Sequence, residues 1–100
     1  LPPTPFDSGP AWHQFVVRFK ERETWMKWFR QHQVGCSLHY ADPIHTMPAY
    51  ESLGYRLGDL PRTESACREV LSLPMYPELS DSQVDRVIEV IRLGLKFGLT

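Results

Sequence analysis

No apolar stretch in this 100-residue sequence approaches the roughly 20 residues that a membrane-spanning helix needs. The amino terminus lacks the pattern of a secretory signal peptide. The formal net charge is only −1, and the basic residues are spread along the chain without forming a stripe. These features argue against a membrane protein and against a nucleic-acid-binding protein. We therefore expect a cytoplasmic protein whose partners include neither a membrane nor a nucleic acid.

Cysteine is scarce, and the histidines are not grouped as metal ligands usually are. Cys36 and Cys67 are far apart and form no CxxC pair, which favours two reduced thiols and leaves a disulfide between them as the alternative. The four histidines include no HxxxH pair on a helix and join no Cys/His cluster. We therefore expect no metal site.

The common catalytic motifs are also missing. The sequence has no GxSxG elbow, no GxGxxG or GxxxxGK phosphate loop, and no cysteine in a catalytic-cysteine motif. A lysine that forms a Schiff base needs burial or neighbouring charge to depress its pKa. Lys20, Lys27 and Lys96 fall at a strand end or at helical surface positions. The motifs alone therefore identify no catalytic residue in this sequence.

The composition indicates one domain preceded by a different kind of segment. One hundred residues suffice for one modest core. The opening LPPTPFDSGP holds four of the nine prolines, and the sequence does not begin with methionine. We predict that residues 1–11 are an extended linker from something upstream, that residues 12–100 form the domain, and that the sequence is a fragment.

Strand and helix periodicities alternate along the domain. Alternating residues predict strands over residues 13–19, 34–39 and 72–75, while helical spacing predicts helices over residues 22–33 and 60–71 and one after Ser80. One helical turn over residues 47–53 should close at Gly54. This order predicts an α+β fold with a small three- to four-stranded sheet, mixed or antiparallel, covered by helices on one face.

Helix-capping residues sharpen two of these predictions. Ser80 and Gln83 form a capping box at the start of the last helix. One face of this helix is apolar and consists of Val84, Val87, Ile88, Ile91 and Leu95. The helix should fray after Leu93 because Gly94 and Gly98 weaken its end. Asp59 can cap the helix over residues 60–71, whose Glu64 precedes Arg68 by four residues as in a surface ion pair.

The segment GCSLHYADPIHTMPAY, residues 35–50, points most directly to function. Its strand ends in His39 and Tyr40, and a loop stiffened by Pro43 and Pro48 then carries His45. Loops held by a rigid scaffold commonly carry binding residues. The residues alone leave two interpretations open: His39 and Tyr40 cap the sheet, or they face a ligand.

At these residues the sequence resembles the DegT/StrS-type, pyridoxal-phosphate-dependent sugar aminotransferases. The resemblance covers roughly residues 12–93 and includes WHQFVVRF, QHQVGCSLHY, PIHTMPAYESLGY, the GDLP turn and REVLSLPMYPELSDSQVDRVIEVI. It implies the C-terminal small domain of a fold-type-I aminotransferase, joined by residues 1–11 to a large domain that is missing from this sequence. It also implies that His39 and Tyr40 bind substrate, with His45 as a weaker candidate.

The resemblance implies an enzyme when the large domain is present and inactivity without it. Pyridoxal 5'-phosphate would sit on a lysine of the large domain, with no cofactor on this sequence. The substrates would be a nucleotide-linked keto sugar and glutamate, and the products would be deoxyamino sugars for polysaccharides or glycosylated natural products. The full-length protein would be a homodimer.

Two other functions remain open. One is a pyridoxal-phosphate-dependent sugar dehydratase of the same family, in which histidine replaces the catalytic lysine. The other is a free-standing, non-catalytic binding or interaction module. In an isolated small domain, Trp25, Trp28 and the chain ends should be exposed, because they would normally meet the large domain.

Overall fold

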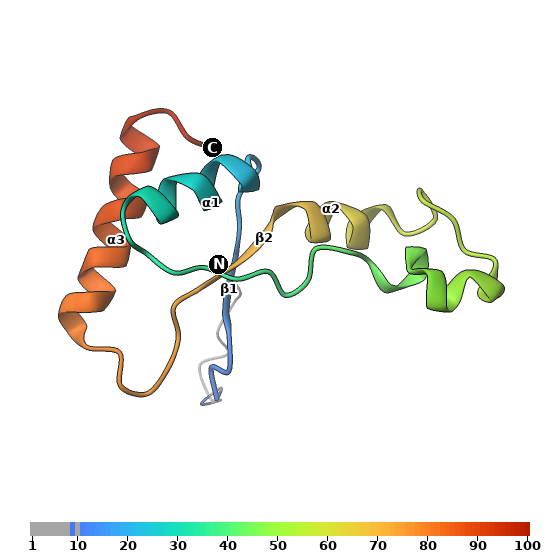
Figure 1. Cartoon of the computed structure of the whole chain (residues 1–100), viewed down its shortest axis with the longest axis horizontal. Coiled ribbons are helices and arrows are strands. Elements are labelled where there is room, and N and C mark those ends of the chain that lie inside the picture. Colours follow the sequence, from blue (N-terminus) through green and yellow to red (C-terminus); the bar gives the residue numbers. More distant parts are fainter. Residues whose placement is uncertain (1–8, 10) are drawn as a thin grey trace.

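The computed structural model describes residue 9 and residues 11–100. The predicted linker over residues 1–11 therefore lies almost entirely outside the described residues. In chain order the elements are β1 (Phe15–Arg18), α1 (Arg22–Gln31), the 3₁₀ turns η1 (Ile44–Thr46) and η2 (Pro48–Leu53), α2 (Pro61–Glu69), β2 (Val70–Leu73) and α3 (Asp81–Lys96) (Figure 1). No helix in this part of the chain is long and apolar enough to cross a bilayer.

The predicted α+β class is confirmed, but the sheet has fewer strands than expected. β1 and β2 pair antiparallel, with Phe15 opposite Leu73 and Arg18 opposite Val70. The predicted strand over residues 34–39 contributes only one bridge, in which the backbones of Ser37 and Ser72 exchange two hydrogen bonds. Gly35 offers no side chain to pack in this segment, which weakens a strand. The third strand is thus reduced to a single point of contact beside β2.

The core lies between the sheet and helices α1 and α3. Its buried members are Trp25, Phe29, Val34, Leu71 and Val90. The Phe19 ring stacks on Trp25 with their centroids 4.3 Å apart. Trp25 is fully buried and Trp28 is half-buried, so the expectation that both are exposed is wrong. Helical spacing alone could not distinguish a core face from an interdomain face.

Helix α3 has the predicted capping box at Ser80, but it ends later than expected, and of its predicted face only Val87 and Ile91 pack against the core. It continues to Lys96 without fraying at Leu93. Val90 and Gly94 are its buried residues, whereas the predicted Val84, Ile88 and Leu95 are exposed. Gly94 lies against Trp25, where a methyl group would be too close. The glycine therefore allows close packing of α1 and α3 and does not mark the helix end.

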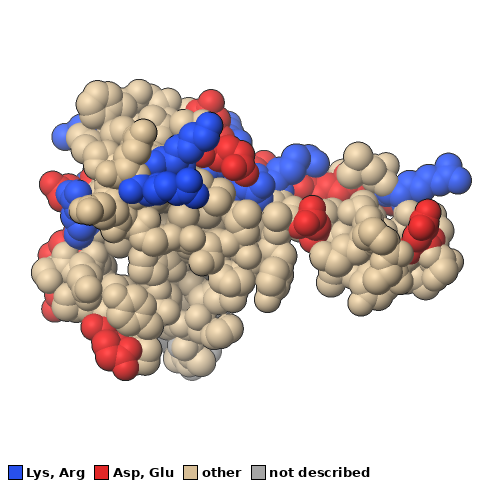
Figure 2. Space-filling view, viewed as in Figure 1, with Lys and Arg blue, Asp and Glu red and all other residues tan. Residues whose placement is uncertain are grey.

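Between α1 and α2 the chain leaves this compact part and forms an arm, defined here as residues 40–60. In Figure 1 the arm and α2 extend away from the packed helices, and Figure 2 shows them as a separate lobe. The predicted turn over residues 47–53 is present as η2 and closes at Gly54, which adopts the left-handed conformation. The Asp59 cap is wrong: Leu60 is the N-cap of α2, and the Asp59 carboxylate accepts from the Arg56 N–H.

Candidate functional site

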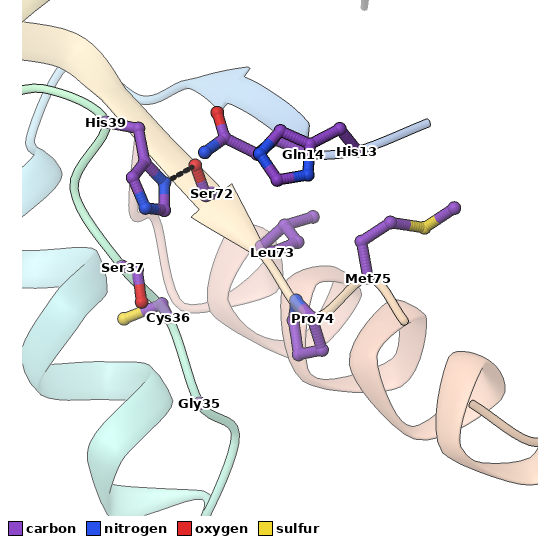
Figure 3. Close-up of a pocket in the computed structure, with 10 residues that line it drawn as sticks. All are labelled: His13, Gln14, Gly35, Cys36, Ser37, His39, Ser72, Leu73, Pro74 and Met75. Carbon is purple, nitrogen blue, oxygen red and sulfur yellow. Dashed lines mark hydrogen bonds between the residues drawn. The ribbon is translucent and has the colours of Figure 1, made fainter. Parts of the chain in front are cut away.

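A cavity of about 320 Å³ opens beside β2, where three segments of the chain converge. The Ser37–Ser72 bridge brings the segment after α1 to one side of β2, and the residues before β1 lie on the other. Figure 3 shows these side chains around the opening. The lining residues are His13, Gln14, Gly35, Cys36, Ser37, His39, Ser72, Leu73, Pro74 and Met75.

His39 is the best-placed functional side chain in this cavity. Its Nδ1 lies 2.8 Å from the Ser72 hydroxyl oxygen, and the ring is half-buried. A serine hydroxyl can donate to or accept from this nitrogen, depending on the tautomer. The contact fixes the ring orientation. Within the described part of the chain Nε2 has no hydrogen-bond partner, so this atom can serve a ligand.

Tyr40 adjoins His39 but does not line the cavity. The two rings pack edge to face with centroids 5.3 Å apart. The Tyr40 side chain is 68% exposed, so most of its ring is free to cover a bound molecule or meet another surface. Its hydroxyl is a donor and acceptor, which suits a sugar or an amide.

The structure places His45 away from the other two predicted residues. It is buried in η1 on the arm and lines a different cavity, of about 340 Å³, together with Glu51, Tyr55 and neighbouring arm residues. Its Nε2 lies 3.0 Å from an oxygen of Glu64. Its Nδ1 is buried without a hydrogen-bond partner. His45 therefore shares no cavity with His39.

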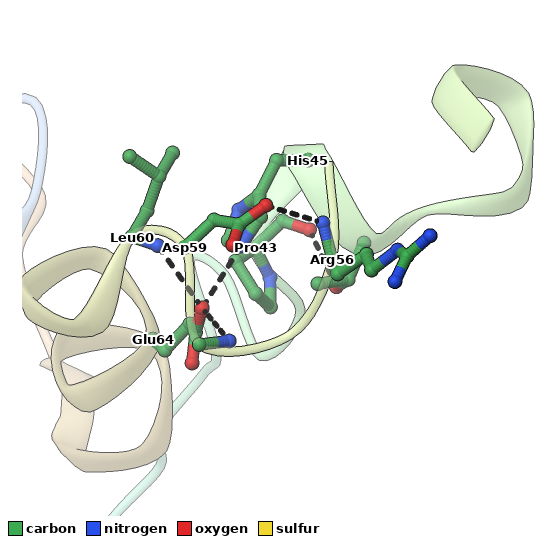
Figure 4. Close-up of polar contacts among 8 residues, drawn as sticks. Pro43, His45, Arg56, Asp59, Leu60 and Glu64 are labelled. Carbon is green, nitrogen blue, oxygen red and sulfur yellow. Dashed lines mark hydrogen bonds and ion pairs between the residues drawn. The ribbon is translucent and has the colours of Figure 1, made fainter. Parts of the chain in front are cut away.

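The Glu64 carboxylate joins three parts of the arm region at one point (Figure 4). One of its oxygens accepts from the Gly58 N–H at 2.7 Å, from the Leu60 N–H at 3.3 Å and from the His45 ring at 3.0 Å. Burial alone would raise the pKa of this carboxyl, but the hydrogen bonds from Gly58, His45 and Leu60 outweigh it and hold the pKa below its usual value. Glu64 is therefore ionised at neutral pH. Because its carboxylate faces Gly58, Leu60 and His45, it does not form the predicted surface pair with Arg68.

The Cys36 thiol lines the first cavity. Burial raises its pKa above the ordinary value, and the nearby charge of Arg30 offsets this only in part. Because the thiolate is the reactive form, the protonated thiol favoured here is a weak nucleophile. Both cysteines are free in the structure. Over the described residues, no three His, Cys, Asp or Glu side chains are grouped to hold a metal ion.

Two residues of these sites were missed from the sequence. Ser72 was expected only as the first residue of a strand, and its contact with His39 depends on pairing between segments 33 positions apart. Glu64 was assigned to a helix surface because its charge and spacing fit an ion pair. Its three contacts come from residues 58, 60 and 45, and no local pattern reveals that they converge.

Comparison with known proteins gives consistent matches to one family. The model of the DegT/DnrJ/EryC1/StrS aminotransferase family matches residues 2–92. The dTDP-3-amino-3,4,6-trideoxy-alpha-D-glucose transaminase of Streptomyces venezuelae is 40% identical over 92% of this chain and 24% of its own length. A pleiotropic regulatory protein of Geobacillus stearothermophilus is 38% identical over 81% of this chain and 22% of its own length.

A solved structure shows the same similarity at the level of the fold. DesV of S. venezuelae, in complex with a ketimine intermediate, matches with a TM-score of 0.86 and 40% identity. The match covers 93% of this chain and 25% of that chain. The chain thus spans about a quarter of the length of the relatives that it matches.

Proposed function

Because the chain belongs to the DegT/DnrJ/EryC1/StrS aminotransferase family, we propose that it is the C-terminal small domain of a pyridoxal-phosphate-dependent sugar aminotransferase. The observation that carries this proposal is the match of nearly the whole chain to one quarter of a sugar transaminase, in sequence and in structure. The intact enzyme would transfer an amino group from glutamate to a nucleotide-linked keto sugar and act as a homodimer. Alone, the domain would be inactive.

The described residues do not fit pyridoxal phosphate. The cofactor of an aminotransferase is held as a Schiff base on a lysine, and such a lysine has its pKa depressed by burial or neighbouring charge. All three lysines of this chain, Lys20, Lys27 and Lys96, are exposed. We therefore assign the cofactor and the chemistry to the large domain, and only substrate positioning to this chain.

Within that assignment, His39 is the substrate-positioning residue. Ser72 fixes its ring through Nδ1, which leaves Nε2 to hydrogen-bond the sugar or its phosphate. Tyr40, exposed beside it, would line the pocket near the sugar ring. His45 is the weaker candidate, because its Nε2 is already held by Glu64.

Steady-state kinetics of the intact enzyme test the role of His39. A hydrogen bond to a charged group contributes about 1.5–3 kcal/mol. If His39 binds a phosphate oxygen, His39→Ala should therefore raise the Michaelis constant for the nucleotide sugar roughly 10- to 100-fold. His32→Ala is the matched control, because His32 ends α1 against the Trp28 ring and does not line the cavity. Unchanged kinetics of His39→Ala would remove His39 from the site.

Two alternatives have separate tests. A sugar dehydratase of the same family would carry histidine in place of the catalytic lysine, so the corresponding residue of the full-length protein distinguishes the two enzymes. A non-catalytic module is favoured by one observation, the regulatory name of the G. stearothermophilus relative. Absorbance of the purified full-length protein where bound pyridoxal phosphate absorbs would support an enzyme, and its absence would support the module.

A further inference from the structure

Helix α3 carries more apolar side chains than the core uses. Its buried residues are Val90 and Gly94, which face α1. A second row of apolar residues, spaced four, three and four positions apart, runs beside this buried face. We call it the outer stripe, and it consists of Val84, Ile88, Ile91 and Leu95. Ile91 borders the core, whereas the other three are 39%, 40% and 55% exposed. Most of the outer stripe is therefore left uncovered by the described residues.

The spacing of the outer stripe is that of a coiled-coil seam. Apolar residues that recur at alternating intervals of three and four positions form a straight row along a helix, and such a row pairs with the same kind of row on another helix. The outer stripe is about 16 Å long, which is three helical turns. Figure 1 shows α3 at the edge of the molecule opposite the arm. This position leaves room for a second helix beside it.

Two opposite charges flank the outer stripe on its solvent side. Asp85 follows Val84 and Arg92 follows Ile91, and both line a surface hollow of about 390 Å³ together with Ile88. Neither charge forms an ion pair within the described part of the chain. The helix macrodipole does not account for them, because its effect fades beyond the terminal turns and each is the fifth residue from an end of α3. Charges beside a coiled-coil seam set the choice and direction of the second helix.

A second α3 that runs antiparallel to the first has the matching pattern. In this orientation Val84 of one copy meets Leu95 of the other, and the isoleucines in the middle of the two stripes meet each other. Asp85 of each copy then lies beside Arg92 of the other, which gives two ion pairs related by two-fold symmetry. In a parallel pair the same charges would face the uncharged side of the opposite stripe. The charge pattern therefore selects the antiparallel arrangement.

We propose that α3 pairs antiparallel with the α3 of a second copy of this chain, through the outer stripe and the two Asp85–Arg92 contacts between copies. Three turns of helix bury less than the roughly 1,000 Å² that a stable interface needs, so the association is weak and depends on protein concentration. Because its ion pairs are exposed to solvent, it also weakens as the salt concentration rises. The inference needs only a second copy and does not rest on the proposed function.

Sedimentation velocity of the full-length protein over a range of concentrations tests the contact. Asp85→Arg and Arg92→Asp each turn both ion pairs into like-charge contacts, so each change should weaken the self-association roughly tenfold. Arg86→Asp is the matched control, because it makes the same change of charge on α3 at a residue that pairs with Glu89 of its own helix. We expect this control to associate as the parent protein does. Equal association of the parent protein and the Asp85 and Arg92 variants would overturn the proposal.

Combining the two changes identifies the occupant of the outer stripe. In the double variant Asp85→Arg/Arg92→Asp the charges exchange places, and association should return. An equimolar mixture of the two single variants should also associate, because one copy then carries two positive flanking charges and the other two negative ones. A contact with another part of the same polypeptide could not be restored by mixing. A mixture that associates no better than either variant alone would therefore overturn the proposal. These measurements require no enzymatic activity, so their outcome is independent of the proposed function.

Discussion

Replacing Gly94 with alanine should destabilise the chain, although alanine is the better helix former. An ideal Cβ at this position lies 2.7 Å from Cη2 and 2.8 Å from Cζ3 of Trp25, and 3.1 Å from Nε1 of Trp28. Carbon atoms pack best at about 3.5–4.0 Å, so the added methyl group is about 1 Å too close. Trp25 cannot easily yield, because it is fully buried and its ring stacks on Phe19.

The free-energy contributions that favour and oppose alanine at position 94 can be compared. Relative to glycine, alanine inside a helix contributes about 1 kcal/mol of stability. Overfilling a packed core costs about 1–3 kcal/mol. Displacement of Trp28 also threatens the hydrogen bond from its Nε1 to the Val90 carbonyl, which is 3.0 Å long, and such a bond contributes about 1 kcal/mol. With the methyl group against a fixed ring, the overpacking cost lies near the upper end of its range, so the net loss is about 2 kcal/mol when the Trp28 hydrogen bond is kept and about 3 kcal/mol when it breaks.

Urea unfolding followed by tryptophan fluorescence measures this loss, since Trp25 and Trp28 report on the contact itself. For a chain of this size a loss of about 2 kcal/mol lowers the urea midpoint by about 1–2 M. Gly35→Ala is the control, because nothing lies within 4 Å of its Cβ position and its φ is not in the left-handed region. A Gly94→Ala variant more stable than the parent chain would show that helix propensity dominates and that α1 and α3 are not in close contact there.

Three further predictions follow from single contacts. The hydrogen-bonded Glu64 carboxylate stabilises the fold at pH values above the ordinary glutamate pKa, and this stabilisation is lost as the pH falls through its lowered pKa. In a ¹³C NMR titration of Glu64 the midpoint should therefore lie below 4.5, and a midpoint above 4.5 would contradict the assignment. Because burial raises the pKa of the Cys36 thiol, its alkylation by iodoacetamide at pH 7 should be slower than that of free cysteine, and an equal or faster rate would show an exposed thiolate. Ser80→Ala removes the acceptor for the Gln83 N–H and should cost about 1 kcal/mol in the urea experiment, whereas no change would mean that the capping box contributes nothing.

Local signals predicted the elements well and their partners poorly. The capping box at Ser80, the turn that ends at Gly54 and the helix beginning at Arg22 all depend on residues within a few positions of each other. The third strand failed because pairing depends on what lies beside it, and only Ser37 meets β2. In α3, apolar residues occur on more than one face, so the sequence could not show that Val90 and Gly94 are the residues that meet α1.

The candidate site shows the same difference between local features, which the sequence reveals, and contacts between distant residues, which it does not. His39 and Tyr40 were found because two polar rings at the end of an alternating segment are a local feature, and the resemblance then gave them a role. His45 was grouped with them because it is near in sequence, yet the loop carries it onto the arm and into a different cavity. Its partner Glu64 is 19 positions away, and Ser72 is 33 positions from His39. Only the folded arrangement shows which polar side chains act together.

The compact part of the chain and the arm are held together by different interactions. The first closes around Trp25, Phe29 and Val90, whose neighbours in the core are hydrophobic side chains. The arm depends on one ionised carboxylate that holds η1 and the loop before α2. A polar junction of this kind fixes the shape of a segment without burying its apolar side chains.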